Sequence, residues 1–139
     1  MRNIAATLRF RTRGSGLMEI TSEVRGWLES QGVLTGLLTL FCRHTSASLL
    51  IQENAARAVR SDIENYFAAL APEDPSRYEH DDEGPDDMPA HLRTALTGVQ
   101  VSIPVNEGRM ALGTWQGIYL FEHRRSPHER ELALHLIGE

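Results

Sequence analysis

Apolar and polar side chains alternate along four segments near the two ends of the chain. Residues 3–12 (NIAATLRFRT) place apolar side chains on one side and polar ones on the other, which is typical of a half-buried β-strand. Residues 99–105, 117–123 and 130–137 repeat this alternation. The apolar run 33–41 (VLTGLLTLF) predicts a further, buried strand.

Between these strands, apolar residues recur at helical spacing in three places. Residues 19–31 predict a helix that ends at Gly32, where a left-handed residue is favoured. A second helix is predicted to begin at Asn54, which can cap it, and to end before Pro72. A third is predicted from the aspartate pair at 86–87 to the glycine at position 98.

Strands at both ends and helices in the middle predict one α+β domain over residues 1–139. We expect an antiparallel, sandwich-like β-sheet with the helices packed on it. A chain of this length is long enough to bury a hydrophobic core without disulfides. Residues 47–52 (ASLLIQ) are expected to continue the strand before them or to form a short partner of it.

The negative charge is concentrated in one segment. The whole chain carries a net charge of −5 at pH 7, whereas residues 72–87 (PEDPSRYEHDDEGPDD) hold eight acidic residues and one arginine, a local −7. The rest of the chain is therefore slightly basic, and the overall balance argues against nucleic-acid binding. The segment is either a solvated loop or a site that attracts cations, and Tyr78 and His80 within it favour the second interpretation.

The number of cysteines and the hydropathy of the chain indicate the cellular compartment of the protein. The single cysteine, Cys42, excludes an intrachain disulfide and favours a reducing compartment. No segment approaches the roughly 20 apolar residues of a membrane-spanning helix. We therefore expect a soluble, cytoplasmic protein without a membrane partner.

Three of the six histidines stand in contexts that suit a functional site. His44 leaves an apolar run and enters a stretch of small residues, His80 lies in the acidic segment, and His91 falls in the first turn of the third predicted helix. Histidines from separate elements with carboxylates nearby are what an open catalytic zinc site uses. The chain has no His-x-x-x-His or Cys-x-x-Cys spacing, so the residues alone leave open whether these histidines bind a metal.

Anion binding is a second theme of the sequence. Arg109 stands in a tight turn beside Gly108, and the helix expected at Asn54 could offer N–H groups to a phosphate. Trp115 and Gln116 lie between two glycines, an arrangement that suits an aromatic ring close to a flat ligand. A solvated turn arginine and a core tryptophan are the simpler interpretations of these residues.

Four segments together resemble the YjbQ-like family, known as secondary thiamine-phosphate synthase enzymes. They are HTSASLLIQENA (44–55), DDMPAHLRTALTG (86–98), IPVNEGRMALGTWQGIYLFEHR (103–124) and RELALHL (130–136). The resemblance spans nearly the whole chain, and the combination of segments is what makes it specific. The turn after residue 122 departs from the Asp-Gly-Pro turn that is frequent in the family.

The resemblance implies a compact α+β sandwich that assembles as a homotrimer around a pocket of histidines and acidic residues. It also implies a divalent metal, zinc or magnesium, at a cluster of three histidines. Carried over motif by motif, these metal ligands are His44, His80 and His91.

The same motifs imply roles for other residues. Glu53, Asn54 and Arg109 would be catalytic, with Arg109 holding a phosphate. The ligand pocket would contain Thr45, Ser46, Trp115, Gln116 and Glu122. We expect residues 47–52 to cross the floor of a single pocket, with His44 at one end and Glu53 and Asn54 at the other.

The activity implied by the resemblance joins a pyrimidine diphosphate to a thiazole phosphate and releases pyrophosphate. The expected substrate is therefore a phosphorylated small molecule. Two alternatives stay open: a metal-dependent phosphoester hydrolase that uses the same histidines, and a non-enzymatic protein that binds a metal or a small ligand. The sequence does not decide whether the chain is an enzyme.

Overall fold

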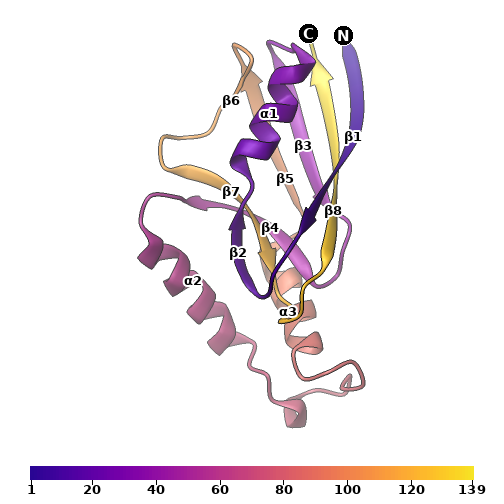
Figure 1. The fold of residues 1–139 in the computed structure, drawn as a ribbon, viewed down its shortest axis with the longest axis vertical. Helices are drawn as coiled ribbons and strands as arrows, with labels where there is room; N and C mark the ends of the chain where they lie inside the picture. The colour runs from indigo at the N-terminus through magenta and orange to yellow at the C-terminus, as the bar shows by residue number, and fades with distance from the viewer.

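Two antiparallel β-sheets and three α-helices make up the fold in a computed structural model that describes all residues 1–139 (Figure 1). The strands are β1 (Arg2–Arg11), β2 (Gly16–Glu19), β3 (Gly36–Cys42), β4 (Ala47–Glu53), β5 (Gln100–Asn106), β6 (Arg109–Met110), β7 (Gln116–Glu122) and β8 (Glu129–Gly138). The helices are α1 (Thr21–Gln31), α2 (Arg57–Leu70) and α3 (Asp87–Thr97), with a short 3-10 helix at Pro75–Arg77. The predicted α+β class is confirmed.

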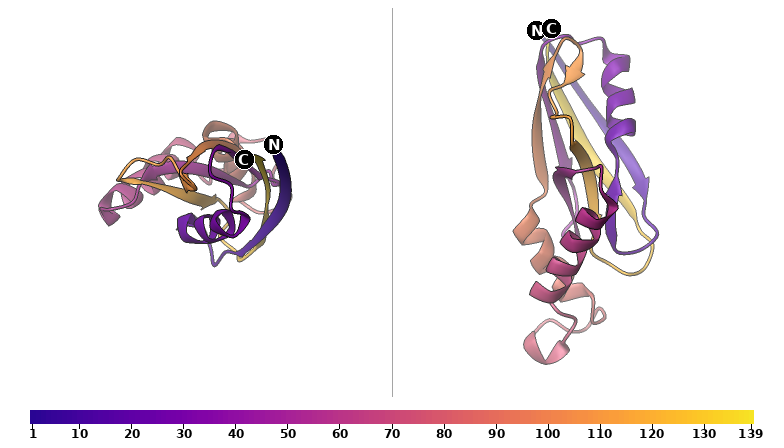
Figure 2. Two further views of the ribbon diagram at one scale, coloured as in Figure 1. Left: turned by 90° about the horizontal axis from the view of Figure 1, so that it is seen from above. Right: turned by 90° about the vertical axis from the view of Figure 1, so that its left-hand side faces the viewer.

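The larger sheet has the strand order β1-β8-β3-β5-β6. Strand β1 pairs with β8 along its whole length, from Arg2 opposite Gly138 to Arg11 opposite Glu129. This register brings the two chain ends together at one end of the molecule (Figure 2). The alternation seen in the sequence is the alternation of this sheet, because every second residue of β8 faces the core.

The smaller sheet has the order β2-β7-β4. The expectation that residues 47–52 continue or pair with the preceding strand is wrong, because β4 pairs with β7, with Ala47 opposite Glu122 and Glu53 opposite Gln116. Residues 43–46 carry the chain from the larger sheet to the smaller one. As the middle strand, β7 is buried from Gly117 to Glu122 on both faces.

One hydrophobic cluster joins both sheets to α1. Val24 and Leu28 of α1 are almost fully buried and pack with apolar residues of β3, β4, β5, β7 and β8. Strand β1 curls around α1 in the view from above (Figure 2). Each fully buried side chain of this size contributes about 1.5–3 kcal/mol, so this cluster is the main source of stability.

The predicted ends of α1 at Gly32 and of α3 at Gly98 are confirmed, whereas α1 begins at Thr21, after strand β2 rather than at residue 19, and the predicted start of α2 is wrong. Gly32 has φ 69° and terminates α1 in the left-handed conformation. Helix α2 begins at Arg57, and the residue before it has no side-chain cap. Asn54 does not cap the helix because its N–H still pairs with the carbonyl of Trp115 at 2.9 Å, as part of the strand.

The helices α2 and α3 lie at the opposite end of the molecule from the chain termini (Figures 1 and 2). Helix α2 has no buried residue, so its apolar stripe is largely uncovered within one chain. None of the helices combines the length and the apolar character needed to cross a bilayer.

Candidate functional site

Four side chains converge where the acidic segment meets α3. His80 and Glu83 come from the loop, and Asp87 and His91 come from the first turns of the helix. One ligand atom from each lies within 4.8 Å of the others. His80 Nε2 lies 2.9 Å from Asp87 Oδ2, and His91 Nε2 lies 3.3 Å from the same oxygen. Asp87 and His91 share one helix face because they are four residues apart.

Arg124 holds the aspartate pair at the start of α3. Its Nη1 donates to Asp87 Oδ1 at 2.8 Å, and its Nε donates to Asp86 Oδ2 at 3.2 Å. The backbone N–H of Arg125 donates to the same oxygen of Asp86 at 2.9 Å. Burial raises the pKa of Asp86, but these donors outweigh it and hold the pKa below its ordinary value.

Hydrogen bonds orient the imidazole rings of His80 and His91 and affect the pKa values around them. His91 Nδ1 lies 3.0 Å from the carbonyl oxygen of Thr45, so Nδ1 carries a hydrogen and donates it there, while Nε2 faces the carboxylate of Asp87. The hydrogen bond with Asp87 raises the pKa of His80 against the opposing effect of burial. Burial raises the pKa of Asp87, and the charge of His91 and the bond to His80 outweigh it, so this pKa is lowered. These groups favour a cation between them, either a proton or a metal ion.

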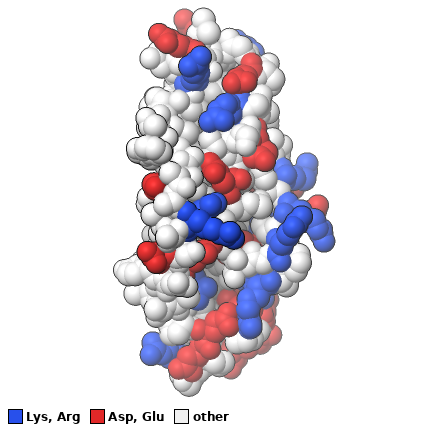
Figure 3. Space-filling model, turned by 60° about the vertical axis from the view of Figure 1, so that its left-hand side comes forward, with Lys and Arg blue, Asp and Glu red and all other residues white.

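Acidic side chains gather at the lower end of the molecule (Figure 3). The sequence left undecided which aspartates of the segment reach the site. Asp87 does so directly, whereas Asp82 contacts the other ring nitrogen of His80 at 3.4 Å. Asp86 is engaged by Arg124 and Arg125 instead.

His44 lies outside the group of four. Its Nε2 accepts the backbone N–H of Glu131 at 2.7 Å, and burial lowers its pKa, which keeps this nitrogen an acceptor. His44 and His91 nevertheless line one shallow cavity of about 600 Å³, together with Thr45 and Phe41. The structure thus brings His80 and His91 together with carboxylates. His44 is not part of this group but lines a neighbouring cavity with His91, next to Thr45 in the sequence.

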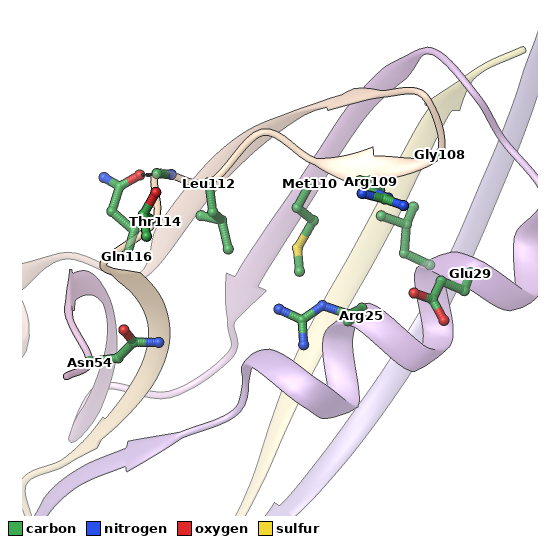
Figure 4. A pocket seen from close by; sticks show the side chains of 11 residues that line it. Arg25, Glu29, Asn54, Gly108, Arg109, Met110, Leu112, Thr114 and Gln116 are labelled. Atoms are coloured by element: carbon green, nitrogen blue, oxygen red, sulfur yellow. Dashed lines mark hydrogen bonds between the residues drawn. The ribbon is translucent and has the colours of Figure 1, made fainter.

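A second group of predicted residues surrounds a different cavity, of about 430 Å³, between α1 and β6 (Figure 4). Arg109 lines it from β6, and Asn54 and Gln116 line it from the opposite side. Arg25 and Glu29 of α1 complete its charged rim. Arg25 and Arg109 are exposed and take part in none of the ion pairs of the molecule, so both guanidinium groups are free to bind an anion.

The two amide side chains of this cavity are fixed by neighbours. Gln116 Oε1 accepts the N–H of Gly113 at 2.8 Å, which leaves the amide N–H₂ of Gln116 for other acceptors. Asn54 Nδ2 donates to Glu19 Oε2 at 3.1 Å, which leaves its carbonyl oxygen for other donors. The cavity between α1 and β6 therefore offers guanidinium donors together with an oriented donor and an oriented acceptor.

The expected single pocket is divided into two separate sites within one chain. His44 precedes β4 and Asn54 follows it, and the seven residues of β4 span about 23 Å at about 3.3 Å per residue. The histidine cluster and the cavity between α1 and β6 therefore lie at opposite ends of this strand. A stiff strand keeps its two ends apart, which is why one element does not bring both groups to a single ligand.

Several other predicted ligand residues have structural partners. Glu122 is almost fully buried and pairs with Arg130, which also donates to Ser46 Oγ at 3.0 Å. Glu53 accepts the N–H of Ala56 at 3.2 Å and so satisfies the start of α2. Trp115 is 63% exposed. The pairing with Arg130 explains the burial of Glu122 without a ligand role.

Residues that the sequence analysis did not assign as ligands include Glu83, Asp87 and Arg124. The Asp87–His91 pair had a usable signal, namely two metal-binding residue types four positions apart at the start of a helix. Arg124 had none, since it reaches α3 from the end of a strand 37 positions away from Asp87.

A small α+β domain that gathers two imidazoles and two carboxylates at the start of one helix has the features of a candidate metal-binding protein. The chain belongs to the YjbQ family, since residues 6–139 match the family described as UPF0047 protein YjbQ-like.

Relatives and solved structures agree with this assignment. The chain is 52% identical over 128 residues to a UPF0047 protein of Synechocystis, covering 92% of this chain and 87% of that protein. It is 46% identical over 135 residues to the UPF0047 protein YjbQ of Salmonella typhimurium, covering 96% and 95%. A conserved hypothetical protein of Thermus thermophilus has a TM-score of 0.85 at 35% identity, covering 95% and 99%. These descriptions name no catalytic activity.

Proposed function

We propose that this chain is a divalent-metal-dependent enzyme that acts on a phosphorylated small molecule. The observation that carries the proposal is the convergence of His80, Glu83, Asp87 and His91 within 4.8 Å. The hydrogen on Nδ1 of His91 is engaged by Thr45, so Nε2 is available as a ligand atom. The donor set fits a metal ion.

The mixture of donors favours zinc over magnesium. Imidazole nitrogen suits zinc, whereas magnesium prefers oxygen ligands and retains several waters. His80, Glu83, Asp87 and His91 would hold the ion, and the carboxylate of Asp87 is already ionised at neutral pH because its pKa is lowered. A bound metal would supply charge stabilisation for a phosphate or diphosphate group.

The specific reaction we propose is of the secondary thiamine-phosphate synthase type, in which a pyrimidine diphosphate and a thiazole phosphate combine with release of pyrophosphate. Two anionic substrates require two places for phosphate. The cluster provides one, and Arg25 and Arg109 support a second, because free guanidinium groups bind phosphate strongly. Asn54 and Gln116 would orient the rest of that substrate.

Assembly with further copies, as a homotrimer, is part of the proposal. The two substrates must meet in order to react, and the ends of β4 within one chain are too far apart for this, so a second chain would have to supply one of the two sites. Large exposed apolar side chains support such contacts, among them Tyr66 at 63% exposure and Leu70 at 51%. A stable monomer in sedimentation at micromolar concentration would refute the assembly.

Metal analysis tests the central part of the proposal. We expect about one zinc ion per chain in wild-type protein prepared without a histidine tag, and loss of it in His80→Ala and His91→Ala. His135→Ala is a matched control, because this exposed histidine lies on β8 and its side chain hydrogen-bonds only to Asn3. His44→Ala distinguishes the two possible ligand sets. Retention of the metal in this variant supports the group His80, Glu83, Asp87 and His91, whereas loss of the metal supports the three histidines expected from the sequence. Folded wild type that takes up no metal would refute the site.

Turnover assays then separate the two reaction classes. Pyrophosphate release that requires both a pyrimidine diphosphate and a thiazole phosphate would support the synthase reaction. Hydrolysis of a simple phosphate ester in the absence of a second substrate would identify a phosphoester hydrolase. Neither activity in metal-loaded protein would leave a metal-binding protein and refute the enzymatic proposal.

A further inference from the structure

A third cavity lies between α2 and the smaller sheet, away from both sites described above. Its volume is about 200 Å³, and it is lined by Glu64 and Phe67 of α2, Arg93 of α3, and Phe121 and His123 at the end of β7. At about 30 Å³ per water molecule, this is room for several waters or for one small organic molecule.

Arg93 is a buried cation with no carboxylate at ion-pair distance, although the charges of Glu73 and Asp86 act on it from farther away and are themselves paired with Arg125 and Arg124. It is 8% exposed, and no ion pair of the molecule includes it. Its guanidinium makes one hydrogen bond, from Nη2 to the carbonyl of Ala71 at 2.6 Å, and its Nε is buried without a partner. Burying an unpaired charge is costly, so this group calls for an anion in the adjacent cavity.

His123 also lines this cavity, and it carries a second buried polar atom without a partner. It is 1% exposed; Nε2 contacts Ser48 Oγ at 2.9 Å, and Nδ1 has no partner. Burial and the charge of Arg93 lower the pKa of His123 to about 3, so the ring is neutral at physiological pH. A neutral ring can donate or accept at Nδ1 according to its tautomer.

The opposite wall limits the charge that the cavity can accept. Glu64 accepts the N–H of Leu17 at 2.7 Å, and Glu122 is neutralised by its pairing with Arg130. The carboxylate of Glu64, which has no ion-pair partner, disfavours a dianion such as phosphate, whereas a single negative charge can be placed beside Arg93.

An aromatic wall adds an apolar surface. The rings of Phe67 and Phe121 meet edge to face with centroids 5.7 Å apart, and Phe121 lies 4.2 Å from the ring of His123. A ligand that carries a short hydrocarbon group could place it against these rings while its charged end faces Arg93.

We propose that this cavity binds a small monocarboxylate with a short apolar part, held by Arg93 and His123. The site is separate from the proposed metal cluster, because His91 and Arg93 are two positions apart on α3 and so point about 200° apart around the helix axis. Binding at this cavity does not depend on a metal ion at the cluster.

Propionate is a suitable probe, with its neutral isostere propionamide and inorganic phosphate as comparisons at constant ionic strength. We expect propionate to shift the ring NMR signals of His123 saturably and to raise the melting temperature. Propionamide and phosphate should do neither. The same result is expected after EDTA treatment, which distinguishes this site from the metal cluster.

Variants then test the contribution of the buried arginine. Arg93→Gln should weaken propionate binding roughly tenfold or more, since a hydrogen-bonded charge is removed. Arg77→Gln is the matched control, because Arg77 is exposed and pairs only with Asp74. If Arg93→Gln does not fold, the wild-type titration still decides. Unchanged His123 signals in propionate, or a larger response to phosphate, would overturn the proposal.

Discussion

Removing Arg130 should destabilise the protein strongly, because its partner Glu122 is almost fully buried. Glu122 is 1% exposed and Arg130 is 4% exposed. The carboxylate accepts two bonds from Arg130, one from Thr12 Oγ1 at 2.6 Å, and the backbone N–H groups that follow it. Arg130→Met would leave this carboxylate buried without its counter-charge.

The expected cost of Arg130→Met is about 3–5 kcal/mol, the range for breaking one side of a buried ion pair. The double variant Glu122→Gln/Arg130→Met should recover much of this loss, because a neutral amide can still accept the bond from Thr12 and the buried charge is gone. We expect a coupling energy of about 2 kcal/mol or more in this double-mutant cycle.

Urea unfolding at pH 7 and one fixed protein concentration measures these changes, with an unchanged slope as the check on two-state behaviour. The control is Arg9→Met, since Arg9 is exposed and pairs with Glu131 at 3.2 Å. Its expected cost is below about 1 kcal/mol. If Arg130→Met costs no more than Arg9→Met, the pair is not a structural constraint, and the ligand role expected for Glu122 from the sequence regains support.

Three further outcomes follow from local environments. Gly36→Ala should lower the free energy of unfolding by about 2 kcal/mol, because the new methyl group meets the backbone carbonyl of Ile137. Gly26→Ala in α1 has open space around it and should raise the free energy of unfolding by about 0.5–1 kcal/mol. Urea unfolding of both variants measures these changes. The pKa of His123 is about 3 in the folded protein and about 6.5 in the unfolded chain, so the unfolded state binds an extra proton between these values. The free energy of unfolding should therefore fall by about 2 kcal/mol from pH 6.5 to 5. His123→Asn should lack this pH dependence. Burial raises the pKa of Cys42 to about 11, so thiol reagents at pH 8 should react only on unfolding, and rapid labelling of native protein would contradict this.

Hydrophobic periodicity predicted most of the secondary structure, because each pattern shows which face of a helix or strand is buried, and this depends on residues close together in the sequence. The alternation in residues 3–12 and 130–137 corresponds to the paired strands β1 and β8. Gly32 indicated the end of α1, because the left-handed backbone conformation at this position has a higher free energy for residues other than glycine. Residues 47–52 were recognised as extended, but their sheet was not, because strand partners are set by contacts distant in sequence.

The candidate site was recognised in part. His80 and His91 were expected to act together and do lie together, with ring centroids 5.9 Å apart. Arg109 and Asn54 were expected to share a pocket with His44, and the length of β4 separates them. Residue types and motifs indicate which chemistry a side chain can perform. The spacing of residues along the chain does not show where a strand places them in space.

The sequence by itself determined the α+β class, the positions of most elements, the family, and the residue types that can bind metal and phosphate. Only the tertiary structure decided that Asp87 and Glu83 join the histidines, that Arg124 anchors them, and that Glu122 is a buried structural partner of Arg130. It also revealed Arg93 and His123 at one cavity. The physical reason is that periodicity records which face of an element is buried, whereas a site depends on side chains from several elements whose separation is fixed only when sheets and helices pack.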